Sequence, residues 1–148
     1  FTGTWQGRFG AVWDLREGRM AKRFDGAHVV GAFRPDGATL CVGTAEKHVF
    51  YETGSWRILR EHARSEGVDL AIAVAFSADC QTVAIPHSRY QTRLVDTKTA
   101  AVLATLRNPE GVATSMLCFD STGSTLIAIT AAKDLLAWDL VPREAENE

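Results

Sequence analysis

The sequence predicts an all-β protein built from a repeated unit of four short antiparallel strands. Two phrases that recur in phase along the chain carry this prediction. The first is a strand ending in Phe, then a polar turn and a pair formed by Thr and an aliphatic residue, written AFRPDGATL at 32–40, AFSADCQTV at 75–83 and CFDSTGSTL at 118–126. Its phenylalanines, Phe33, Phe76 and Phe119, are 43 residues apart, a spacing typical of repeat architectures.

The second phrase is an aromatic or aliphatic residue followed by an acid at the end of a short apolar run. It occurs four times, as Trp13-Asp14, Tyr51-Glu52, Val95-Asp96 and Trp138-Asp139. After the first three copies come turn residues and another apolar run, REGRMAKRF, TGSWRILREH and TKTAAVLATL. Each unit is therefore expected to hold a strand ending in Phe, its hairpin partner, a strand ending in the acidic pair, and an outer strand.

In chain order, the phrases predict one domain over 1–148 with an incomplete first unit at 1–25 and complete units at 28–62 and 70–106. A last unit at 112–140 lacks its outer strand, and an acidic tail follows at 141–148. The opening FTGT resembles the end of a second strand, so the first unit is expected to lack its innermost strand. The apolar run LAIAVAF at 70–76 has the length of a strand that is buried on both faces.

The motifs VWDLREG, AFRPDGATL, TGSW and LLAWDL resemble the WD-repeat β-propellers, whose signature is one Trp-Asp dipeptide per four-stranded blade of about 40–45 residues. The resemblance covers essentially the whole chain. It implies an incomplete ring of about three and a half blades, whereas family members usually close rings of about seven. We expect the chain to be the C-terminal part of a larger propeller or to pair with a second copy, because an open arc leaves apolar faces bare and prone to self-association.

Composition is that of a globular domain, with 46% hydrophobic and 23% charged residues, and no apolar run is long enough for a membrane helix. Three cysteines, Cys41, Cys80 and Cys118, occur one per repeat. An odd number without CxxC spacing favours small buried thiols in a reducing compartment, so we expect a cytoplasmic protein. Cys118 has the position of Ala32 and Ala75 in the other copies.

The sequence offers no motif for catalysis, a cofactor or a metal. It contains no GxSxG, phosphate-binding glycine loop or HExxH. The four histidines, His28, His48, His62 and His87, show no helical or hairpin spacing that would pair them, so no metal site is expected. The resemblance implies a non-enzymatic protein-binding scaffold. The alternative is a propeller hydrolase or lyase whose catalytic residues lie partly outside this segment.

The resemblance also implies a structural role for His28. In the family, a His before the innermost strand bonds a Ser or Thr, which in turn bonds the Trp of the dipeptide. The sequence GAH at 26–28 resembles the first element, and Thr130 with Trp138 resembles the other two in the last unit. Tyr51 stands where that Trp is expected in the unit that contains His28. Ala132 stands where an Asp that orients the His is expected in the last unit, so no unit holds the complete network.

Charge gives little indication of a nucleic-acid partner, because 16 basic residues face 18 acidic ones. The middle of the chain is locally basic, through Arg57, Arg60, Arg64, Arg89 and Arg93. Solvated outer strands explain these arginines most simply. A patch that binds phosphate or an acidic partner is the alternative.

Propellers usually bind partners through the turns that enter the innermost strand and those that join the second strand to the third. PHSRYQ at 86–91 is the most unusual of these turns, since it combines His, Arg and Tyr. The predicted protein-binding surface comprises His28, Lys47, Asp69, His87, Arg89, Tyr90 and Lys133. The predicted repeat core comprises Trp13, Phe33, Phe76, Phe119 and Trp138. The simpler interpretation of PHSRYQ is a solvated loop with Tyr90 packed on its own blade.

Overall fold

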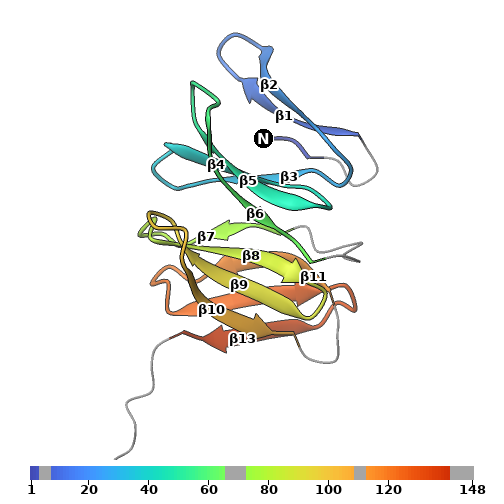
Figure 1. Ribbon diagram of the computed structural model, residues 1–148, viewed down its shortest axis with the longest axis vertical. Coiled ribbons are helices and arrows are strands. Elements are labelled where there is room, and N and C mark those ends of the chain that lie inside the picture. The colour runs from blue at the N-terminus through green and yellow to red at the C-terminus, as the bar shows by residue number, and fades with distance from the viewer. Residues whose placement is uncertain (4–7, 66–72, 109–112, 141–148) are drawn as a thin grey trace, which may run out of the picture.

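The computed structural model describes residues 1–3, 8–65, 73–108 and 113–140 (Figure 1). The prediction of an all-β fold is confirmed, because these residues form four small antiparallel sheets and no helix. The described part of the chain thus holds no helix that could cross a membrane. The predicted tail at 141–148, and the predicted starts of two units at 70 and 112, lie outside the described residues.

The first sheet pairs β1 (Phe9–Asp14) with β2 (Arg19–Asp25). On the other edge of β1, Thr2 forms an isolated antiparallel bridge with Ala11. The second sheet follows the chain order in its strands, which are β3 (Val30–Phe33), β4 (Thr39–Gly43), β5 (Lys47–Glu52) and β6 (Ile58–Ala63).

The third sheet repeats this order with β7 (Ala75–Phe76), β8 (Thr82–Ser88), β9 (Gln91–Asp96) and β10 (Val102–Arg107). Its first strand has only two residues, so the long strand expected at 70–76 is not formed by the described part of that run. The last sheet consists of β11 (Thr114–Phe119), β12 (Thr125–Thr130) and β13 (Leu135–Asp139).

The sequence repeat is reproduced in the strand register. The repeated phenylalanines occupy equivalent cross-strand pairs, Phe33 with Leu40, Phe76 with Val83 and Phe119 with Leu126. The turns between these strands also match, because each has one residue in the left-handed conformation: Gly37 (φ 73°), Cys80 (φ 63°) and Gly123 (φ 75°). Glycine adopts this conformation without strain, whereas Cys80 does not.

In the first and third sheets, the acid of the second phrase caps the turn that follows it. Asp14 Oδ1 accepts hydrogen bonds from the amides of Arg16 (2.9 Å) and Glu17 (3.1 Å). Asp96 Oδ1 does the same for Lys98 (2.8 Å) and Thr99 (2.6 Å). These backbone hydrogen bonds lower the pKa of both carboxyl groups. A short acidic side chain therefore recurs here because it fixes the turn into the outer strand.

The sheets stack face to face in chain order, with an apolar cluster between each consecutive pair (Figure 1). Adjacent residues of one strand serve different clusters, since side chains alternate across a sheet. Leu40 packs toward Val12 and Phe24 of the first sheet, whereas Cys41 packs toward Val83 of the third. The inner strands β3 and β11 each contact β7, and residues of β3 and β11 line a hollow of about 200 Å³ together with Ala73 and Val74, which precede β7.

The predicted repeat core is packed at three of its five positions. Phe76, Phe119 and Trp138 are half-buried and pack against clusters between sheets. Phe33 is instead 37% exposed and Trp13 is 43% exposed. Phe33 pairs with Leu40 and so faces the first sheet, which has no innermost strand among the described residues to cover it. Trp13 lies at the surface, where its Nε1 donates to Thr2 Oγ1 at 3.0 Å.

The outer face of the last sheet is apolar and uncovered in the structure. Met116 is 61% exposed and Leu135 is 70% exposed. A hollow of about 240 Å³ on this face is lined by Met116, Leu117, Cys118, Ile127, Ile129 and Leu135. Cys118 was expected to be buried like Ala75, but it is exposed because β11 turns it toward this open face.

Candidate functional site

In the last three sheets, the turns that join the second strand to the third lie at one edge of the stack, on the right of Figure 1. Equivalent hydrogen bonds fasten the outer strand to this turn in the two middle sheets. The Arg64 amide donates to the Glu46 carbonyl at 2.9 Å, and the Asn108 amide donates to the Tyr90 carbonyl at 2.8 Å. We call this edge the rim.

The rim turn at 88–91 has a fixed backbone and exposed side chains. Asn108 is 5% exposed, and its Nδ2 donates to the Arg89 carbonyl and to Thr114 Oγ1, each at 3.0 Å. The amide of Tyr90 donates to Ser88 Oγ at 3.2 Å. Arg89 is nevertheless exposed, and Tyr90 is 60% exposed. More than half of the Tyr90 surface is therefore exposed to solvent.

The other predicted surface residues differ in their surroundings. His28 is half-buried and Lys133 is exposed, and both have left-handed backbone conformations, with φ of 53° and 71°. Lys47 is bound through Nζ to Glu61 Oε1 at 2.9 Å, and this hydrogen bond raises the pKa of Lys47. Asp69 lies outside the described residues. His87 belongs instead to a cluster of basic side chains where the second and third sheets face each other.

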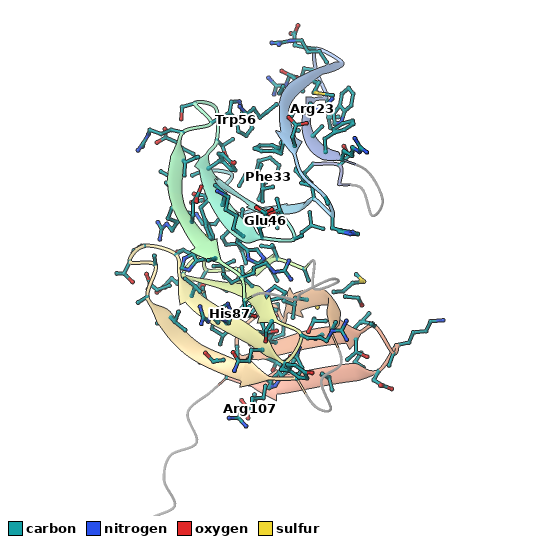
Figure 2. All side chains as sticks on the ribbon, turned by 45° about the vertical axis from the view of Figure 1, so that its right-hand side comes forward. Arg23, Phe33, Glu46, Trp56, His87 and Arg107 are labelled. Carbon is teal, nitrogen blue, oxygen red and sulfur yellow. The ribbon has the colours of Figure 1, made fainter. Side chains whose placement is uncertain are left out.

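Six basic side chains gather where the second and third sheets face each other near the rim. Along β6, Arg60 and His62 point to the same face, and His48 on β5 is the cross-strand partner of His62. On the third sheet, Arg93 pairs with Ile85, which packs in the cluster between these two sheets. Figure 2 labels His87 on the third sheet, and the amide of Ser65, just after β6, donates to the His87 carbonyl at 3.0 Å. We define the basic cluster as His48, Arg60, His62, Arg64, His87 and Arg93.

The sequence-based expectation that no spacing pairs the histidines was wrong for His48 and His62. They are 14 residues apart and meet across a hairpin whose turn follows Glu52. The alternation Arg60, His62, Arg64 was a usable signal, because every second residue of a strand lies on one face. Aligning β5 with β6 through their hairpin turn places His48 opposite His62.

Burial and the neighbouring basic groups lower the pKa of all three imidazoles. His48 is 1% exposed, and its pKa falls to about 3 because of burial and the nearby Arg64, His62 and His87. Burial, with Arg60 and Arg93, lowers the pKa of His62. Burial and Arg93 lower that of His87. Burial also lowers the pKa of Arg64 to about 10, which leaves its guanidinium charged at pH 7.

Several polar atoms of the basic cluster are buried without a hydrogen-bond partner. They are His48 Nε2, His62 Nε2, Arg60 Nη1 and Arg93 Nε. Neither Arg60 nor Arg93 forms an ion pair with a carboxylate in the described ranges. A buried polar group without a partner costs about 1–3 kcal/mol, so these atoms would be stabilised by a hydrogen-bond partner.

The basic cluster is not arranged as a metal centre. Within the described ranges, no group of three or more His, Cys, Asp or Glu side chains is placed to hold a metal ion. The guanidinium groups carry hydrogen-bond donors and no acceptors. The chemistry of this donor set therefore suits a negatively charged group.

No protein-family model matches this chain, and no curated protein matches it in sequence. Its function is therefore inferred from its own residues and their geometry.

Proposed function

We propose that this chain is part of a WD-repeat β-propeller and that it acts as a non-enzymatic scaffold for a protein partner. Three features support the propeller assignment. The two middle sheets have the same four-strand order, the repeated residues share one register, and β7 contacts the inner strands of the sheets on either side of it, next to a hollow. In such an arrangement, each sheet would be one blade.

The observation that carries the scaffold role is the rim turn at 88–91. Tyr and Arg are enriched among residues that dominate binding energy, because each combines a large contact area with polar groups. Here Asn108 fixes the backbone while the Tyr90 side chain stays 60% exposed. Because the turn is already ordered, a partner would lose little conformational entropy on binding it.

The open face of the last sheet has a separate role in this proposal. Met116, Ile129 and Leu135 form an apolar surface on a sheet whose opposite face packs against the third sheet. Stacked repeats are stabilised largely by their neighbours. A further propeller blade, from the same protein or a second copy, would cover this surface.

The scaffold role is tested by capturing partners with the whole protein under crosslinking. Tyr90→Ala and Arg89→Ala should each lose the same captured protein, whereas Tyr90→Phe should retain most of it because the ring remains. Arg16→Ala is the matched control, since Arg16 is exposed in the turn after β1 at the opposite edge (Figure 1). An identical set of captured proteins for parent and Tyr90→Ala, at equal melting temperatures, would contradict the proposal.

A further inference from the structure

The basic cluster is confined to one of three equivalent interfaces between sheets. The cross-strand pair His48–His62 has the counterparts Thr92–Leu106 on the third sheet and Gly10–Phe24 on the first. Arg93, paired with Ile85, has the counterparts Leu136, paired with Ala128, and Val49, paired with Val42. The stack therefore does not require charge at these positions.

The counterpart of Arg64 shows the same specialisation. Its amide bond to the Glu46 carbonyl is matched by that of Asn108 to Tyr90 and that of Gly26 to Arg8. Asn108 and Arg64 both also hold a carbonyl of the neighbouring turn with their side chains, Asn108 that of Arg89 and Arg64 that of Thr44 at 2.7 Å. A neutral amide serves this purpose in the third sheet, so the turn alone does not explain a buried guanidinium.

We propose that the basic cluster is a binding site for a phosphate group. The unpartnered nitrogens of Arg60, His62 and Arg93 are its donors. They come from β6 on one side and from β9 on the other, and the buried His48, whose ring lies over Gly43, is the cross-strand neighbour of His62. A tetrahedral oxyanion accepts hydrogen bonds from several directions and thus matches donors on two sheets better than a planar carboxylate does.

Access and charge agree with this assignment. Arg60, His62, His87 and Arg93 are half-buried, so the cluster borders solvent at the side of the interface, and their side chains would turn outward to present the buried nitrogens to an anion. A bound dianion would offset the guanidinium charges and supply acceptors for the unpartnered nitrogens. This inference goes beyond the scaffold role and stands independently of it, because it uses the interface behind the rim and not the exposed turn.

The test measures the melting temperature of the full chain at pH 7.5 while inorganic phosphate replaces chloride at constant ionic strength. We expect a saturable rise of about 3 to 5 °C at ten times the dissociation constant. Arg93→Gln should melt higher than the parent without phosphate, because it removes repulsion, and should lose the phosphate-dependent rise.

Arg107→Gln is the matched control, because Arg107 is exposed on β10 and its removal changes net charge by the same amount. It should keep the full response to phosphate. Arg60→Gln gives a second variant if Arg93→Gln does not fold, and it should also weaken the response, because it removes another donor. The proposal is overturned if phosphate has no saturable effect, or if Arg93→Gln or Arg60→Gln responds as the parent does.

The source of the phosphate group is distinguished by titrating O-phosphoserine in parallel. Tighter binding of O-phosphoserine than of inorganic phosphate assigns the site to a phosphorylated side chain. Tighter binding of inorganic phosphate assigns it to the free anion. Both outcomes support the site, and failure of both probes to bind overturns it without affecting the test on Tyr90.

Discussion

Two interfaces between sheets can be compared, that of the second sheet with the third and that of the third with the last. They are alike near the inner strands, their inner half, and differ toward the rim, their outer half. In both, a repeated phenylalanine packs into an apolar cluster, Phe76 in one and Phe119 in the other. Toward the rim, the first interface carries the basic cluster, whereas the second carries uncharged residues such as Thr92, Leu106 and Leu136. The inner half thus meets the structural need, which leaves the outer half free to differ.

The largest effect is expected from the inner half. Phe76→Ala should reduce the free energy of unfolding by about 3 kcal/mol, the lower end for large-to-small core changes, because Phe76 is half-buried. It packs edge-on against Phe50, with ring centroids 6.3 Å apart. Phe33→Ala is the matched control and should cost under about 1 kcal/mol, since Phe33 is 37% exposed. Urea unfolding measures both, and equal losses would show that the two positions are equally packed.

A smaller effect on stability, at acidic pH, should distinguish the two interfaces, because the one between the second and third sheets contains the buried His48. Burial depresses the pKa of His48 to about 3, below the 6.5 expected in the unfolded chain. The unfolded state therefore binds the proton first, and stability falls as the pH drops from about 6.5 toward 3. The slope for one such group is about 1.4 kcal/mol per pH unit.

His48→Thr should remove that share of the slope between about pH 6 and 4.5, where the carboxyl groups with lowered pKa values, such as Asp96, remain ionised. His62 and His87 should keep a residual slope, because their pKa values are also lowered. The measurement is urea unfolding at intervals of half a pH unit. A parent and variant with parallel curves would mean that His48 is protonated in the folded protein.

The smallest effect concerns the turns of the same two sheets. Cys80 has φ of 63° at the position held by Gly123, φ 75°, in the last sheet. Cys80→Gly should raise stability by about 0.5–1 kcal/mol because it relieves a left-handed side-chain clash. Gly123→Ala should lower it by a similar amount. If thermal unfolding shows Cys80→Gly to be destabilising, the thiol makes contacts that outweigh the backbone strain.

The sequence predicted the fold better than the candidate site, and particular residues show why. Phe76 and Asp96 recur in phase, so periodicity alone located the strands, and the structure explains both by packing and turn capping. Phe33 has the same local sequence as Phe76 but not the same burial, because burial depends on the neighbouring sheet. His62 and Arg93 are 31 residues apart and come together only when two sheets stack, which periodicity within one unit does not reveal.

The three cysteines lie at three depths, one in each of the last three sheets. Cys41 is buried in the second sheet, where burial raises the pKa of its thiol; Cys80 is half-buried in a turn of the third; and Cys118 is exposed on the last. Thiol-reactive reagents should therefore label them in the order Cys118, Cys80, Cys41. The labelling rate of Cys118 consequently reports whether the open face is covered, and the labelling rate of Cys41 reports how often the second and third sheets separate.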